Sequence, residues 1–178
     1  MRYTLDDDPP DPADIVEVIA STVLARGLTK PPRLLLEPGR SIVARSAIAL
    51  YAVGTVKDIR GIRTYVSVDG GMADNPRPAM YQSKYLALLA NRHSNEPPAP
   101  VTIAGRYCES GDVLVRDVRL PKLQRGDLLA IPAAGAYHMS MASTYNMVGR
   151  PAVAMVSNGE TRLTRKRETD DDLLAVFP

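Results

Sequence analysis

The single cysteine of the sequence stands in a segment that could carry acid–base chemistry. Cys108 directly precedes Glu109, and the segment continues with Ser110, Gly111 and Asp112. A thiol can act as a general acid that gives a proton to a carbanion. A lone cysteine is more often a small buried hydrophobic residue, so a catalytic role for Cys108 needs support from other groups in the chain.

An arginine and a tyrosine in the segment Arg77-Pro78-Ala79-Met80-Tyr81 form a second candidate. The planar guanidinium group of arginine binds a carboxylate through two directional hydrogen bonds, which lysine cannot match. The segment therefore indicates carboxylate binding by Arg77, with Tyr81 four positions further along the chain. The alternative interpretation is a surface arginine beside a packed tyrosine.

A third motif, Glu37-Pro38-Gly39-Arg40, follows the apolar run Leu34–Leu36. Ligands of α/β folds bind where a buried strand ends, and an arginine together with backbone N–H groups can neutralise a phosphate there. The alternative is a turn that carries a surface ion pair.

The fourth motif is Gly135-Ala136-Tyr137, and it is followed by His138. For His138 we expect a partly exposed, structural histidine. Along the chain the motifs follow one another in the order Glu37–Arg40, Arg77–Tyr81, Cys108–Asp112 and Gly135–Tyr137. Taken together and in this chain order, they resemble the C-terminal part of the diaminopimelate decarboxylases, which use pyridoxal 5'-phosphate (PLP). The resemblance extends from about residue 34 to residue 156.

The resemblance implies four cofactor contacts. Glu37 would pair with the pyridine nitrogen of PLP, Gly39 and Arg40 would lie against its phosphate, and Tyr137 would also contact the phosphate. A carboxylate at the pyridine nitrogen keeps that nitrogen protonated, so the ring can accept the electrons that remain when carbon dioxide departs.

It also implies the substrate contacts and the reaction, the conversion of meso-diaminopimelate to L-lysine and carbon dioxide, the last step of lysine biosynthesis. The substrate-binding residues would be Arg40, Arg77, Tyr81, Glu109 and Tyr137. In this family Cys108 would protonate the substrate carbon and Glu109 would recognise its far amino end. Two subunits of a homodimer share each active site, so both residues would reach the cofactor of the partner subunit. Tyr145 and Asn146 match a Tyr-Asn pair near the same site.

The family fold is a PLP-binding (β/α)₈ barrel followed by a β-domain, and the barrel carries the lysine that holds PLP. Such a barrel takes about 250 residues, more than the 178 residues present. No lysine of this chain matches that segment; the lysines are Lys30, Lys57, Lys84, Lys122 and Lys166. We therefore expect residues 1–45 to be the last helix and strand of a barrel and residues 46–178 to be the β-domain, with the missing barrel segment as a partner.

Local patterns predict the elements. Asp11 followed by Pro12 indicates the start of a helix over residues 12–26, and Leu34–Leu36 indicates a strand buried on both faces. Short β-like runs separated by Gly, Pro, Asn and Asp cover 47–56, 63–68, 85–89, 101–104, 113–115, 128–131 and 153–156. Residues 69–75 indicate a glycine-rich loop, and 140–145 and 169–174 indicate short helices. The predicted fold is mainly β: a C-terminal β-barrel or Greek-key-like domain preceded by a helix–strand remnant of the (β/α)₈ barrel.

Composition limits the alternatives. The formal charge is only +2, and the basic stretch 162–167 is followed by three aspartates, which argues against nucleic-acid binding. One cysteine excludes an intrachain disulfide, and His93 and His138 have no metal-site spacing. The N-terminus lacks the features of a signal peptide, and no apolar run has membrane-spanning length, so we expect a cytoplasmic protein that contacts no membrane.

Two classes of function remain. The first is part of a diaminopimelate decarboxylase that is inactive until the barrel with its lysine is supplied. The second is a non-catalytic β-domain that folds and dimerises without activity of its own. A related decarboxylase of carboxynorspermidine, arginine or ornithine is a further alternative, which Glu109 and the segment from Arg77 to Tyr81 disfavour.

Overall fold

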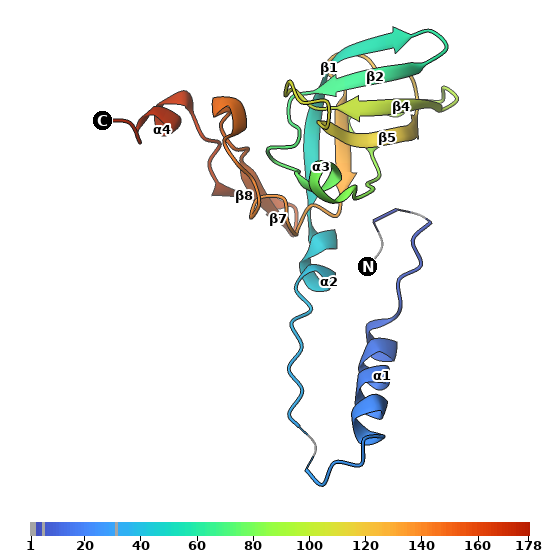
Figure 1. Ribbon diagram of the computed structural model, residues 1–178. Helices are drawn as coiled ribbons and strands as arrows, with labels where there is room; N and C mark the ends of the chain where they lie inside the picture. Colours follow the sequence, from blue (N-terminus) through green and yellow to red (C-terminus); the bar gives the residue numbers. More distant parts are fainter. Residues whose placement is uncertain (1–2, 5, 31) are drawn as a thin grey trace.

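The computed structural model describes residues 3–4, 6–30 and 32–178, and Figure 1 shows a curled sheet with a helical arm at one end of the chain and a hairpin at the other. The elements are α1 (Pro12–Leu24), α2 (Arg40–Val43), η1 (Ala44–Ser46), β1 (Ile48–Ile59), β2 (Arg63–Val68), α3 (Arg77–Tyr81), β3 (Leu88–Leu89), β4 (Ala99–Ala104), β5 (Val113–Leu120), β6 (Leu128–Pro132), η2 (Tyr145–Met147), β7 (Val153–Ser157), β8 (Glu160–Arg165) and α4 (Asp170–Leu174).

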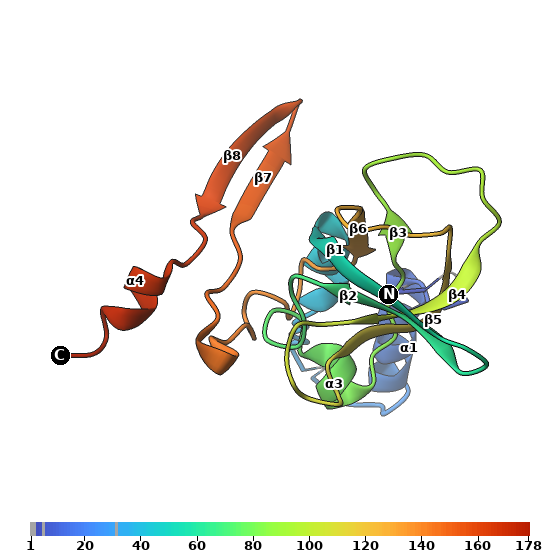
Figure 2. The same cartoon turned by 90° about the horizontal axis from the view of Figure 1, so that it is seen from above.

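Six strands form one sheet in the order β3-β6-β1-β2-β4-β5, with β3 and β5 at its edges. β2 and β4 run parallel and the other neighbours run antiparallel. A register shift interrupts the β1–β2 pairing between Val53 and Val56, and such bulges increase strand bending and twist. The sheet curls into a half-barrel (Figure 2), which confirms the mainly β prediction.

The core is a cluster of buried side chains from the strands of this sheet and from the segments around residues 85–87 and 123. Its most deeply buried apolar side chains are Val66, Ile103, Leu129 and Ile131, each fully enclosed. Burying a side chain of this size contributes about 1.5–3 kcal/mol. The strands that carry these residues also fix the positions of the loops at their ends, where the functional candidates lie.

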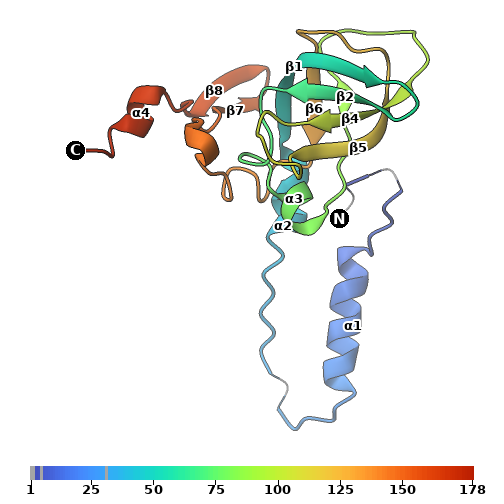
Figure 3. The same cartoon turned by 45° about the horizontal axis from the view of Figure 1, so that its top comes forward.

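The N-terminal helix forms as predicted. Asp11 caps it by accepting a hydrogen bond from the Ala13 N–H at 2.8 Å, and Pro12 occupies its first turn. In Figure 3 helix α1 and the extended segment that follows it stand away from the sheet. None of the helix residues is buried, and Val18 is 63% exposed and Leu24 72% exposed.

The predicted strand at Leu34–Leu36 is not formed, so this part of the sequence prediction is wrong. The three leucines lie in an extended segment without strand pairing and are 46%, 76% and 54% exposed. A strand needs neighbouring strands to pair with, and no described segment of this chain lies beside these residues in a sheet. Among the described residues, the apolar run is therefore left exposed and unpaired.

The C-terminal region forms a separate two-stranded hairpin, β7–β8, followed by α4. Thr169 and Asp172 form a capping box that starts α4, as the sequence indicated. The short helix predicted at 140–145 is wrong: residues 140–141 form a turn, residues 142–144 have no regular structure, and Tyr145–Met147 makes a 3₁₀ turn. Asn146 has a φ of +55°, which interrupts any continuous helix there.

Within the described ranges, no helix is long and apolar enough to cross a membrane.

Candidate functional site

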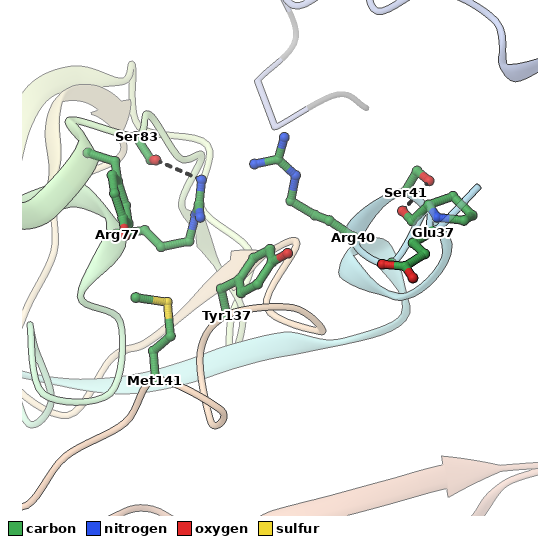
Figure 4. Close-up of a pocket in the computed structure, with 10 residues that line it drawn as sticks. Glu37, Arg40, Ser41, Arg77, Ser83, Tyr137 and Met141 are labelled. Carbon is green, nitrogen blue, oxygen red and sulfur yellow. Dashed lines mark hydrogen bonds between the residues drawn. The ribbon is translucent and has the colours of Figure 1, made fainter. Parts of the chain in front are cut away.

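An open cavity of about 710 Å³ lies where α2, α3 and the segment after β6 meet. Figure 4 shows Arg40, Arg77 and Tyr137 extending into the same opening. The lining residues are Glu37, Pro38, Gly39, Arg40, Ser41, Arg77, Tyr81, Ser83, Tyr137 and Met141. One cavity is therefore lined by all four residues predicted to contact the cofactor. Arg77 and Tyr81, predicted to bind the substrate, line the same cavity.

Gly39 shapes the part of this wall that precedes α2. Its φ of +24° lies in the left-handed region, which favours glycine. The turn is closed by the N–H of Ser41, which donates to the carbonyl oxygen of Pro38 at 3.0 Å, while the Ser41 hydroxyl donates to the same oxygen at 2.7 Å. This turn places Glu37 and Arg40 on the same cavity wall.

Arg77 is held between two aromatic rings. Its guanidinium carbon is 5.3 Å from the centre of the Tyr81 ring and 5.2 Å from that of Tyr137, and its Nη2 donates to the Ser83 hydroxyl at 3.3 Å. Cation–π contacts of this kind hold a guanidinium group without neutralising its charge. Arg77 therefore presents a guanidinium group at the cavity, a group suited to an anion such as a carboxylate.

Tyr3 is a residue of this region that no sequence motif indicated. Its ring is 5.5 Å from the guanidinium carbon of Arg40 and 6.0 Å from that of Arg77, and it packs edge-on against Tyr85 at 5.2 Å. Ser83 and Met141, which also line the cavity, carried no sequence signal either.

Cys108 and Glu109 do not line this cavity and belong to a second group. Cys108 is exposed, and its Sγ lies 3.9 Å from Glu109 Oε1 and 3.7 Å from Asn146 Nδ2. The hydroxyl of Tyr145 donates to the carboxylate of Glu109, and this carboxylate raises the pKa of Tyr145. The Tyr-Asn pair noted in the sequence thus meets the Cys-Glu pair.

His138 lies behind the cavity and is 5% exposed, so the expected partial exposure is wrong. Its ring packs edge-on against Tyr85 at 5.7 Å between centres. Burial lowers the pKa of His138 to about 4, because the charged imidazolium is poorly solvated there. The histidine is therefore neutral at physiological pH.

The donor set fits part of a PLP site. Arg40 and the Gly39 turn suit a phosphate, and the Glu37 carboxylate suits a protonated ring nitrogen. Among the described residues that line the cavity there is no lysine. The described residues also contain no cluster of three or more side chains suited to a metal ion.

Comparison with known proteins identifies the class. Residues 14–135 match the family described as "Pyridoxal-dependent decarboxylase, C-terminal sheet domain". The chain belongs to this family, a class of PLP-dependent amino-acid decarboxylases, and covers its C-terminal sheet domain.

Several proteins of this class that the chain is similar to are diaminopimelate decarboxylases. The enzyme from Synechocystis sp. is 49% identical over 97% of this chain, and that from Bacillus subtilis is 48% identical over 99%. The crystal structure of diaminopimelate decarboxylase from M. jannaschii in complex with L-lysine matches 99% of the chain at 40% identity, with a TM-score of 0.90. The chain spans only 37%, 41% and 40% of these three proteins, respectively.

Proposed function

We propose that this chain supplies the C-terminal part of a diaminopimelate decarboxylase, which converts meso-diaminopimelate to L-lysine and carbon dioxide in lysine biosynthesis. The observation that carries the proposal is the convergence of Glu37, Arg40, Arg77, Tyr81 and Tyr137 on one cavity. The similarity to a structure that contains L-lysine, the proposed product, supports the same substrate class.

In this proposal the cavity residues bind and orient. PLP, when bound, supplies the electron sink for the decarboxylation. Glu37 holds the proton on the pyridine nitrogen, Arg40 and the backbone at Gly39 bind the phosphate, and Tyr137 contacts it. Arg77 and Tyr81 bind a substrate carboxylate, which Arg40 also approaches.

Cys108 and Glu109 complete the site across a homodimer interface. Cys108 gives a proton to the substrate carbon after carbon dioxide leaves, and Glu109 receives the far amino group. The separation of these two residues from the arginine cavity in one chain supports a site assembled from two subunits. The exposure of Cys108 leaves it available to a partner.

The division of the chain follows from the same proposal. Residues 1–45 would pack as the last helix and strand of the barrel, and residues 46–178 would form the β-domain. The unburied helix α1 and the exposed Leu34–Leu36 run support this division. A contiguous patch of exposed apolar side chains normally marks a surface that packs against a partner. The missing barrel segment is that partner, and without it we expect self-association. The free, exposed Cys108 is compatible with a cytoplasmic location.

The second candidate is a β-domain without catalytic activity of its own. The observation that favours it is the lack of a lysine among the described cavity residues. Decarboxylases of carboxynorspermidine, arginine or ornithine are a weaker alternative. Their substrates carry a single carboxylate, which is lost as carbon dioxide, so Arg77 and Tyr81 would have no second carboxylate to bind.

The test is lysine release from meso-diaminopimelate with added PLP. The full chain is assayed alone and mixed with a separately expressed barrel of the same family that carries the lysine. We expect activity only in the mixture, lost on Cys108→Ala and retained on the neighbouring Ser110→Ala. If the mixture releases no lysine although both proteins are folded and associated, the decarboxylase proposal is contradicted and the non-catalytic domain is favoured. Activity of the chain alone would refute the requirement for an external lysine.

A further inference from the structure

The glycine-rich loop that follows β2 lies between the two groups of functional residues. Its Gly70 carbonyl oxygen accepts the Arg106 N–H at 2.9 Å, and its Ala73 carbonyl oxygen accepts the Ser143 N–H at 2.8 Å. The loop then runs directly into α3, which begins at Arg77. It therefore contacts the segment that bears Cys108, contacts the segment that leads to Tyr145, and positions the arginine of the cavity.

One buried carboxylate links this loop to the Cys108 segment. Asp112 is 3% exposed; its Oδ1 accepts the Met72 N–H at 2.7 Å, and its Oδ2 accepts the Tyr107 N–H at 2.9 Å. Tyr107 directly precedes Cys108. The backbone carbonyl of Asp112 also accepts the Gly105 N–H at 2.9 Å, so the segment 105–112 is closed on itself and tied to Met72.

The chain makes room for this carboxylate with two glycines. A Cβ at Gly71 would lie 2.6 Å from both carboxylate oxygens, and a Cβ at Gly105 would overlap with them. In the part of the chain that the structure describes, no cationic side chain forms an ion pair with Asp112. A buried carboxylate without a cation is costly unless N–H groups satisfy it, so the hydrogen bonds to Met72 and Tyr107 are the interactions that keep it in place.

The neighbouring Asp74 anchors the other side of the loop. Its Oδ1 accepts the Gly71 N–H at 2.8 Å, and the hydroxyl of Tyr51 on β1 donates to its Oδ2. The loop is thus fixed to the sheet through Asp74 and to the Cys108 segment through Asp112. Of the two, only Asp112 connects the loop to the segment that carries the proposed proton donor.

We propose that Asp112 is a positioning residue that couples the arginine cavity to the Cys108–Glu109 pair. In the proposed homodimer the cavity belongs to the active site of the same subunit, whereas Cys108 and Glu109 act in the active site of the partner subunit. Asp112 acts through the two backbone N–H groups and does not touch substrate. The catalytic meaning of this coupling rests on the proposed function, whereas the coupling itself is a property of the chain alone.

The test uses the single cysteine as a labelling site. A nitroxide attached to Cys108 of the full chain reports the mobility of the segment in an electron paramagnetic resonance spectrum. Asparagine at position 112 keeps one acceptor oxygen but turns an N–H toward one of the two backbone donors. We expect Asp112→Asn to shorten the rotational correlation time of the label about twofold or more, as the lost hydrogen bond frees the segment.

The matched control is Asp127→Asn. Asp127 is another buried carboxylate, 1% exposed, which accepts the Gln124 N–H at 2.9 Å and pairs with Arg92. Within the described residues, neither of these partners belongs to the Cys108 segment. We expect this variant to lower thermal stability and to leave the spectrum of the label unchanged. A second variant, Gly105→Ala, leaves Asp112 intact but displaces its carboxylate, and it should mobilise the label as Asp112→Asn does.

Three results would overturn the proposal. The first is equal mobilisation of the label by Asp127→Asn, and the second is an unchanged spectrum in both Asp112→Asn and Gly105→Ala. The third is loss of folding in both of these variants while Asp127→Asn still folds. The measurement needs neither substrate nor PLP, so its outcome is independent of the decarboxylase assay. In an active mixture, Asp112→Asn should lower kcat about tenfold with little change in KM, and should cause no further loss in a Cys108→Ser background. An equal further loss in that background would assign Asp112 a purely structural role.

Discussion

The guanidinium carbon of Arg77 lies 5.2 Å from the centre of the Tyr137 ring. This contact joins α3 to the segment that follows β6, two parts of the chain that are distant in sequence. The planar guanidinium group can stack on an aromatic ring and still present N–H donors to a carboxylate. The cavity therefore depends on an arginine whose orientation is set before any ligand arrives.

Arg77→Lys tests this requirement for a planar donor. Lysine keeps the positive charge but loses the paired hydrogen bonds and the ring stacking, so we expect KM for meso-diaminopimelate in the reconstituted mixture to rise about tenfold or more. Steady-state kinetics measure the change. Arg63→Lys is the control, because Arg63 pairs with Asp117 on the surface and should leave KM unaltered. An unchanged KM in Arg77→Lys would remove Arg77 from the substrate site.

Gly135→Ala tests the close approach that brings the Gly-Ala-Tyr segment to α2. A Cβ at Gly135 would overlap with the carbonyl oxygen of Val43, and the Gly135 N–H already donates to the Ala44 carbonyl oxygen at 2.9 Å. We expect a loss of about 1–3 kcal/mol in the free energy of unfolding, measured by urea denaturation. Gly111→Ala, where a Cβ meets nothing within 4 Å, should change stability much less. Equal effects would show that the overlap is relieved without cost.

The buried His138 predicts a dependence of stability on acid pH. Its pKa is about 4 in the fold against an ordinary 6.5, so between these values the unfolded chain binds the additional proton. The contribution of the neutral His138 to the free energy of unfolding is therefore fully present above pH 6.5. It falls by about 3 kcal/mol in total as the pH drops toward 4. Urea denaturation at pH 7 and pH 4 should show this difference in the wild type and lose it in His138→Phe. The exposed His93→Gln variant should keep it, and a pH dependence unaltered by His138→Phe would contradict the prediction.

The ion pairs of Glu168 predict a second dependence of stability on pH, which concerns the C-terminal hairpin only. Glu168 Oε1 accepts Arg150 Nε at 2.8 Å and Arg165 Nη2 at 2.6 Å. Hydrogen bonding by Arg150 lowers the pKa of Glu168 to about 2 from an ordinary 4.5. A lowered acid pKa gives stability that is present above pH 4.5 and lost as the pH falls toward 2.

Amide hydrogen exchange in β7 and β8 measures this contribution. We expect Glu168→Gln to speed exchange in these strands at pH 7 and to leave exchange in β1 and β6 unchanged. The exposed Glu160→Gln is the control. Faster exchange throughout the molecule would show that the Arg150–Glu168 pair supports the whole fold and not the hairpin alone.

Short-range sequence patterns anticipated much of the fold. The run at 63–68 became β2 with the same bounds, and Asp11-Pro12 and Thr169 mark real helix starts. Such signals are local, since capping and turn residues act on the backbone next to them. By contrast, β8 was not predicted, because Glu160–Arg165 carries few apolar residues and becomes a strand by pairing with β7.

The residue types and the order of the motifs predicted the chemistry: an arginine for a carboxylate and, through the family resemblance, a glutamate and a glycine–arginine turn for PLP and a thiol for a proton. Only the tertiary structure decided how these groups are distributed, with Arg77 and Tyr137 in one cavity and Cys108 in a second group with Asn146. It also decided that Leu34–Leu36 is no strand in this chain and that Asp112 is tied to Met72. These outcomes depend on contacts between segments far apart in sequence, and a local pattern does not encode which distant partner is present.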